Sequence, residues 1–162
     1  MGYTTDFFGE FEFDKPLNEH QIKYIQCFST SRRMIRNSLM LKGIEDPIRE
    51  NVGLPIGDCG EFFLGEAIDY KFFSNDKTVV DHNTPPPTQP GLWCKWTVSD
   101  DGEKLFWNGH EKFYYYTEWL EYMINSFFKP WGYVLNGCVS FQGEHDDDKG
   151  TIYIKNNVVK II

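Results

Sequence analysis

The sequence predicts an α+β fold, in which an antiparallel sheet carries two helices packed on one face and ends in a C-terminal three-strand meander. Three observations lead to this class. Segments near both ends alternate apolar and polar residues, two segments show apolar residues at helical spacing, and short turn-forming sequences join neighbouring strands. The length of 162 residues fits one globular domain spanning residues 1–162.

The first strand is expected over residues 7–13. Phe11 and Phe13 alternate there with Glu10 and Glu12, so the phenylalanines share one face of the strand and the glutamates the other. This pattern is typical of a strand with one buried and one solvated face.

A helix is expected to begin after Asn18, whose side chain suits the N-cap position. Four apolar residues fall on one face if the helix continues beyond residue 30: Tyr24, Phe28, Ile35 and Leu39. Three consecutive hydroxyl residues at 29–31 weaken a helix, so a break or kink near residue 30 is the alternative.

Residues 43–91 show little periodicity and contain six of the eight prolines. Short strands are expected at Val79–Val80 and at residues 61–64, and the proline-rich stretch at 84–90 is expected to be extended. An irregular region of this length in a small domain indicates either a function or pairing that the sequence does not reveal.

The second half of the chain reads as a hairpin, a helix and a meander. The hairpin is expected from strands at 92–98 and 104–107, and the helix is expected at about 111–128. Its core-facing residues recur every three or four positions: Phe113, Tyr116, Leu120, Met123, Ile124 and Phe127. Alternating apolar residues from 133 onward predict three strands, the last two joined at Asn156–Asn157 by a type I′ turn.

Composition excludes several classes of function. The net charge of −8 argues against a protein that coats nucleic acid, and no apolar run is long enough for a membrane-spanning helix. The beginning of the sequence lacks the pattern of an export signal. The four cysteines lie more than thirty residues apart, which is wrong for zinc motifs, so we expect reduced thiols in a cytoplasmic protein.

An arginine cluster is the first candidate site. Arg32, Arg33 and Arg36 are three of only four arginines, and on a helix they would point into one sector about 100° wide. Guanidinium groups bind phosphates and carboxylates in a forked geometry. The cluster therefore predicts either an anion site or pairing with the protein's own acids.

A second aromatic stripe is the other candidate site. Tyr115, Trp119 and Tyr122 lie on a different face of the expected helix from its core residues. Either the chain itself covers this stripe, for example with the proline-rich segment, or a partner does.

Motifs for catalysis, metals and nucleotides are missing from the sequence. No histidine lies in a metal-binding pattern, no nucleophile motif is present, and no glycine-rich phosphate loop occurs. We expect no cofactor and no metal. His110 and His82 lie in expected loops, and either is a candidate acid or base if the arginines bind a phosphate.

Five stretches in combination, MGYTTDF, SRRM-x-RN, PGLWCKW, EKFYYYTEWLEY and PWGYVLNG, cover about a quarter of the chain. They resemble a family of small uncharacterised proteins of bacteria and their viruses. No activity is tied to that family. The resemblance implies one complete domain and no catalytic residues.

The leading hypothesis is a non-enzymatic, cytoplasmic binding protein of bacterial or viral origin, acting on a protein partner or on a second copy of itself. Its binding residues would be the arginine cluster with Tyr115, Trp119 and Tyr122. The alternative is a domain or enzyme that binds a phosphate or nucleotide through Arg32, Arg33 and Arg36, with His110 near the ligand. A mimic of nucleic acid is a third hypothesis, which rests on the acidic charge alone.

Overall fold

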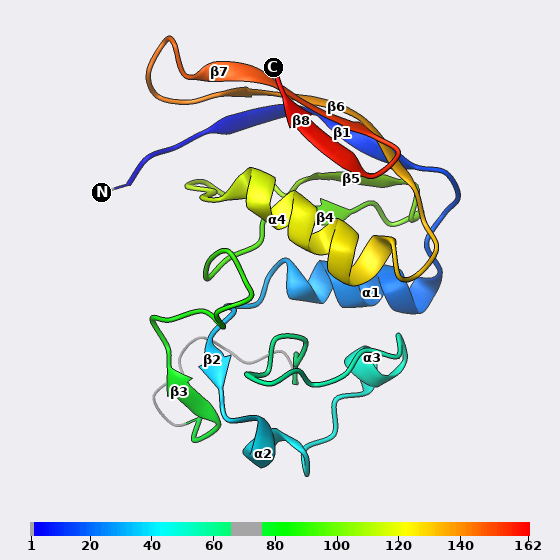
Figure 1. Ribbon diagram of the computed structural model, residues 1–162, viewed down its shortest axis with the longest axis vertical. Coiled ribbons are helices and arrows are strands. Elements are labelled where there is room, and N and C mark those ends of the chain that lie inside the picture. Colours follow the sequence, from blue (N-terminus) through cyan, green and yellow to red (C-terminus); the bar gives the residue numbers. More distant parts are fainter. Residues whose placement is uncertain (1, 66–75) are drawn as a thin grey trace.

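The computed structural model describes residues 2–65 and 76–162 and contains a six-stranded antiparallel sheet (Figure 1). Its strand order is β4-β5-β1-β6-β7-β8. The strands are β1 (Asp6–Phe13), β4 (Trp96–Val98), β5 (Lys104–Trp107), β6 (Leu135–Gln142), β7 (Lys149–Lys155) and β8 (Val158–Ile161). The predicted meander is therefore confirmed, because β6, β7 and β8 are neighbours in this order.

Two helices lie on the same side of this sheet (Figure 1). Helix α1 spans Glu19–Phe28, and helix α4 spans Tyr116–Met123 and continues as a π-helical segment, η2, over Ile124–Phe128. Their apolar faces and the inner face of the sheet form one core. Its largest fully buried side chains include Trp96, Trp119, Tyr24, Phe11 and Phe28. The predicted α+β class is confirmed.

A group of short elements lies beyond α1, on the side away from the sheet (Figure 1). It contains β2 (Ile35–Arg36) paired with β3 (Val79–Asp81), and the single-turn helices α2 (Ser38–Leu41) and α3 (Pro47–Glu50). The strand expected at Val79–Val80 is confirmed, whereas the strand expected at 61–64 is wrong. The carbonyls of that segment bind an arginine side chain instead of a neighbouring strand.

Helix α1 ends at Phe28, so the continuation to residue 39 is wrong and the break near residue 30 is confirmed. The hydroxyl groups after the helix cause the break, because they compete with the backbone for the last carbonyls. Ser29 Oγ donates to the Ile25 carbonyl at 2.7 Å, and Ser31 Oγ donates to the Phe28 carbonyl at 3.1 Å.

Two other predicted elements begin later than expected. The strand expected from residue 92 begins at Trp96, and the helix expected from about residue 111 begins at Tyr116. Lys112 and Tyr115 have φ angles of 61° and 58°, in the left-handed region, so the chain cannot be helical through these residues. The final turn agrees with its prediction, because Asn156 and Asn157 both have the positive φ that a type I′ turn requires.

Candidate functional site

The arginine cluster is not helical, and its three side chains point to different surroundings. Arg32 is partly exposed. Its Nε donates to the His82 carbonyl at 2.8 Å, and its guanidinium lies 5.8 Å from the centre of the Trp93 ring. Arg32 therefore holds the loop after β3 against the segment before β4.

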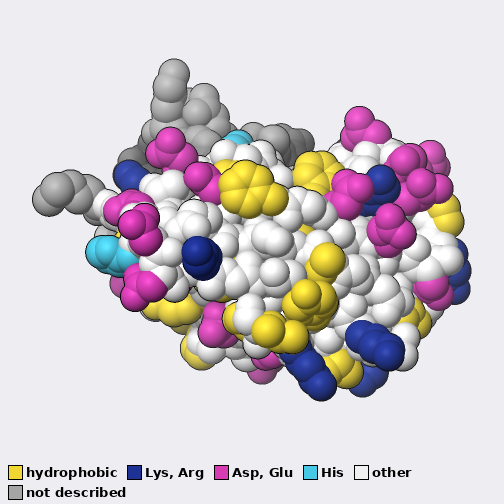
Figure 2. Space-filling model, turned by 90° about the horizontal axis from the view of Figure 1, so that it is seen from above, with side chains coloured by type: hydrophobic (Ala, Val, Ile, Leu, Met, Phe, Trp, Pro, Cys, Tyr) yellow, Lys and Arg dark blue, Asp and Glu magenta, His cyan; other side chains and the backbone are white. Residues whose placement is uncertain are grey.

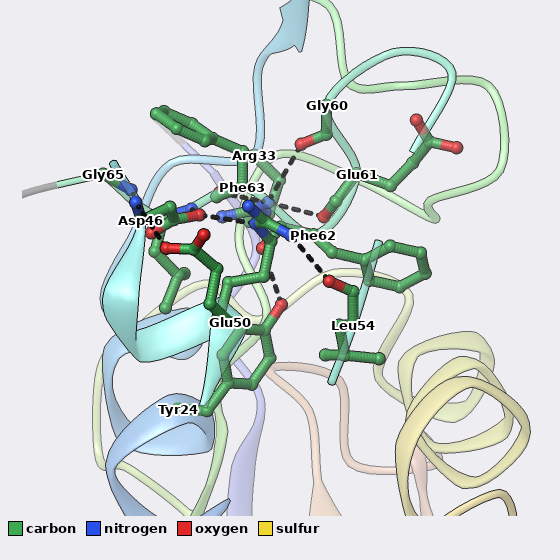
Figure 3. Close-up of polar contacts among 12 residues, drawn as sticks. Tyr24, Arg33, Asp46, Glu50, Leu54, Gly60, Glu61, Phe62, Phe63 and Gly65 are labelled. Atoms are coloured by element: carbon green, nitrogen blue, oxygen red, sulfur yellow. Dashed lines mark hydrogen bonds and ion pairs between the residues drawn. The ribbon is translucent and has the colours of Figure 1, made fainter. Parts of the chain in front are cut away.

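Arg33 is buried, and it binds backbone carbonyls rather than acids (Figure 3). Its Nη2 donates to the carbonyls of Glu61 and Phe63 at 2.6 and 2.9 Å, and its guanidinium lies 4.5 Å from the ring centre of Phe28. Burial lowers the pKa of the Arg33 guanidinium. The side chain therefore ties residues 61–63 to the end of helix α1.

Arg36 is also buried, and it forms an ion pair with an acid of the chain. Its Nη1 lies 2.8 Å from Asp76 Oδ2 and 2.6 Å from Thr78 Oγ1. Burial raises the pKa of Asp76, but hydrogen bonds from Thr78 and Arg36 outweigh it, so the net pKa is lowered. The described structure thus does not bring Arg32, Arg33 and Arg36 together around one open surface.

A buried carboxylate near Arg33 organises the same region, and the sequence analysis missed it (Figure 3). Asp46 has no exposed surface. It accepts a hydrogen bond from Arg49 Nε at 2.9 Å and from the backbone N–H groups of Leu64 and Gly65 at 3.0 Å each. These contacts are internal, so Asp46 and Arg49 form a structural ion pair rather than an open anion site.

The chain itself covers two of the three residues of the second aromatic stripe, Trp119 and Tyr122, which agrees for them with one of the two alternatives predicted. Trp119 is 0% exposed. Tyr122 is half-buried, and its hydroxyl accepts a hydrogen bond from Gln89 Nε2 at 2.9 Å. A Cβ placed on Gly91 would lie 3.8 Å from Trp119 Nε1. The end of the proline-rich segment therefore lies on this face of α4.

Tyr115 and His110 remain at the surface. Tyr115 is 59% exposed and occupies the residue before α4. His110 is exposed in the loop before the helix, where its carbonyl accepts a hydrogen bond from Trp107 Nε1 at 3.0 Å. Neither residue lies with the buried arginines, so the predicted site residues form no single cluster in the described part of the chain.

The outer face of the six-stranded sheet is an exposed surface that carries apolar side chains, and the sequence analysis did not single it out. Phe8 on β1, Tyr153 on β7 and Val158 on β8 are 61%, 43% and 56% exposed. A shallow concavity of about 740 Å³ lies over β6, β7 and β8. Its lining includes Cys138, Tyr153, Val158, Lys155 and Lys160.

Charges on this outer face are separated by strand. Acids lie on β1, where Asp6, Glu10 and Glu12 point outward, and lysines lie on β7 and β8. Figure 2 views this face and shows apolar side chains between regions of acidic and of basic side chains. The acidic strand is partly neutralised at one position, because Lys104 Nζ on β5 lies 2.7 Å from Glu10 Oε1.

The registers place these charges in rows across the sheet. Asp6 pairs with Gln142, which pairs with Lys149. Glu10 pairs with Cys138, and the same row continues through Tyr153 to Lys160. The third row runs from Glu12 through Asn136 toward Lys155, one residue beyond the last pair of the β6–β7 ladder, Gly137 with Ile154. Each row is acidic on β1, neutral on β6 and basic on β7 or β8.

The two edges of the sheet differ. At the β4 edge, helix α1 caps both outward carbonyls: Ser29 Oγ donates to Trp96 and Gln26 Nε2 donates to Val98. At the β8 edge, the backbone N–H and C=O groups of Val159 and Ile161 point away from β7. They make no hydrogen bond within residues 2–65 and 76–162. An uncapped edge favours pairing with another chain.

Sequence reasoning contained a signal for the outer face without using it. The alternation of Glu10 and Glu12 with phenylalanines identifies which side of β1 is solvated, and the same rule applies to Cys138 on β6 and Tyr153 on β7. The sequence alone did not reveal the order of the strands in the sheet. That order places the acidic strand β1 and the basic strands β7 and β8 on opposite sides of β6.

Two further findings concern metals and membranes. The described residues include no group of three or more metal-ligating side chains suited to hold an ion. None of the helices in this part of the chain is long and apolar enough to cross a membrane.

The chain matches no protein-family model, no curated protein and no solved structure. The resemblance of the five sequence stretches therefore adds no residue role, and function is inferred from the geometry of the described residues alone.

Proposed function

We propose that this protein is a non-enzymatic, cytoplasmic protein-interaction protein whose binding surface is the outer face of the six-stranded sheet. Four free cysteines support the cytoplasmic location, since thiols persist in a reducing compartment. The surface lies on regular strands, and such elements hold side chains in fixed positions for a partner.

The observation that carries this proposal is the exposure of apolar side chains on a solvated sheet face. Phe8, Tyr153 and Val158 lie on that face, and a concavity lined in part by Lys155 and Lys160 lies over β6, β7 and β8. Apolar patches with charged surroundings are typical of protein-binding surfaces.

The alternative, a phosphate- or nucleotide-binding site at the arginine cluster, has less support. Arg33 binds backbone carbonyls and Arg36 binds Asp76, so both guanidinium groups already have partners in the chain. A phosphate would have to displace these buried contacts to bind there.

Site-specific photo-crosslinking tests the proposal. A benzophenone amino acid replaces Tyr153 on the outer face in one variant and Tyr115 beside α4 in a matched variant of similar exposure. Irradiation of cells that express the full chain should give protein adducts from position 153 and few from position 115. Val158→Glu, which adds a charge to the same face, should abolish the adducts.

Adducts from both positions alike, or none from position 153, would contradict the proposal. Adducts from position 115 alone would move the binding surface back to the helix face that the sequence predicted. The mass of the adduct shows whether the bound protein is another copy of the chain or a different protein.

A further inference from the structure

We infer that the partner of the outer sheet face is a second copy of this chain, bound face to face about a two-fold axis that runs along β6. This inference rests on the proposed function, because it takes the same surface as the binding surface. Its specific support is the order of charges across that surface.

Two rows of the charge pattern, from Asp6 to Lys149 and from Glu12 to Lys155, are antisymmetric about β6. Rotation by 180° about an axis parallel to β6 places β1 of one copy over β7 of the other. Each residue keeps its position along the strand direction, so residues of the same cross-strand row come to face each other. The registers place Asp6 at the level of Lys149 and Glu12 at the level of Lys155. Asp6 would therefore face Lys149 and Glu12 would face Lys155 of the second copy, whereas Glu10 would face Tyr153.

Other face-to-face arrangements do not have this property. A two-fold axis that lies across the strands would place β1 over β1 and β7 over β7, so acids would face acids and lysines would face lysines. Like charges brought together across an interface oppose association. The charges therefore select the axis along β6 from the two simple ways of stacking this sheet on itself.

The centre of the arrangement is neutral. Cys138 lies on β6 itself, in the row that joins Glu10 to Tyr153, so the two copies of Cys138 would meet at the axis. Packed sheets lie about 10 Å apart, a distance that side chains from both faces fill. Phe8 and Tyr153 flank the axis and supply exposed apolar surface.

The size of the face is at the lower limit for a specific dimer. Strands β5, β1, β6, β7 and β8 contain 4, 8, 8, 7 and 4 residues. Each residue covers about 16 Å², from about 3.4 Å along the strand and about 4.8 Å between strands. The face thus covers about 500 Å² on each copy and about 1,000 Å² in total, which is about the smallest area expected of a biological interface.

Charge reversal tests the inference. One variant carries Asp6→Lys with Glu12→Lys, and the other carries Lys149→Glu with Lys155→Glu. Each reversal changes the charge by two units, so from −8 the variants carry −4 and −12. Native mass spectrometry and sedimentation should show a dimer for the unmodified chain, a monomer for each variant alone, and a one-to-one heterodimer in an equimolar mixture.

A matched control distinguishes the effect of charges on the outer sheet face from the effect of the total charge of the chain. Lys42→Glu with Lys129→Glu also gives −12, but both lysines are exposed away from the outer sheet face. This control should form dimers like the unmodified chain.

A second measurement uses a short bismaleimide, which crosslinks two thiols, on a Cys27→Ser, Cys59→Ser variant. Covalent dimers should form through Cys138 and disappear with Cys138→Ser.

The outcomes distinguish this inference from the proposed function. An unmodified chain that stays monomeric, together with adducts of a different protein at position 153, would overturn the dimer and leave the binding surface in place. A dimer that survives both charge reversals would also overturn the inference and would point to the uncapped β8 edge. Failure of the mixture to associate, with both variants monomeric, would overturn the axis along β6.

Discussion

Replacement of Asp46 by alanine should destabilise the region beyond α1 strongly, although no sequence motif marks this residue. The carboxylate is fully buried and accepts hydrogen bonds from Arg49 and from the backbone of Leu64 and Gly65. In Asp46→Ala, the Arg49 guanidinium stays buried without its counter-ion, and two backbone N–H groups lose their acceptor.

The magnitude follows from these contacts. Hydrogen bonds to a charged group contribute roughly 1.5–3 kcal/mol each to the free energy of unfolding. Part of their loss is offset, because the Asp46→Ala variant does not have to desolvate a carboxylate when it folds. Loss of one partner of a buried ion pair costs roughly 3–5 kcal/mol. We therefore expect a loss of about 4 kcal/mol, a large part of the roughly 5–15 kcal/mol by which domains are stable.

Urea unfolding followed by tryptophan fluorescence measures the global effect, and amide hydrogen exchange at Leu64 and Gly65 measures the local one. Arg49→Leu and the double variant complete a thermodynamic cycle with Asp46→Ala. The two single losses should add to more than the loss in the double variant, by roughly 2 kcal/mol. A loss below about 1 kcal/mol with unchanged exchange, or additive single losses, would refute this account of the ion pair.

Three further predictions concern the helices and the sheet edge. Trp119→Ala should cost roughly 3–5 kcal/mol in urea unfolding because Trp119 is fully buried, whereas Tyr115→Ala should change the stability by less than about 0.5 kcal/mol. Burial raises the pKa of the Cys94 thiol from 9.0 to about 12. The folded state therefore resists deprotonation, so the unfolding free energy should fall as pH rises from 9.0 toward 12, by up to about 1.4 kcal/mol per pH unit, and Cys94→Ala should flatten this decline. Gln26→Ala with Ser29→Ala should uncap the β4 edge and increase large species in light scattering, and unchanged scattering at equal stability would contradict the capping role.

The sheet was largely predictable from local patterns, because each signal lay within one segment. The alternation around Phe11 and Phe13 identified β1, and the pair Asn156–Asn157 identified the turn between β7 and β8. Turn type and alternation depend on near neighbours in sequence, so they remain visible without knowledge of the rest of the fold.

The arginine cluster was not predictable in the same way, because its partners lie far along the chain. Arg33 binds carbonyls 28 and 30 residues away, and Arg36 binds Asp76 at a separation of 40 residues. The sequence offered both outcomes, an anion site and internal pairing, and helical spacing suggested one surface for all three side chains. The break after Phe28 removed that spacing and let the arginines point apart.

The two edges and the outer face of the sheet bear on one question, namely how such a sheet avoids open-ended assembly. Pairing of β8 from one copy with β4 of the next would continue without limit, and the caps from Gln26 and Ser29 on α1 oppose it. Pairing of β8 with β8 would close after two copies, but it would bring Lys160 and Lys155 of both chains near each other. Stacking of the outer faces about β6 also closes after two copies, and it places Lys149 and Lys155 against Asp6 and Glu12. Closure and charge together therefore favour the stacked dimer over either form of edge pairing.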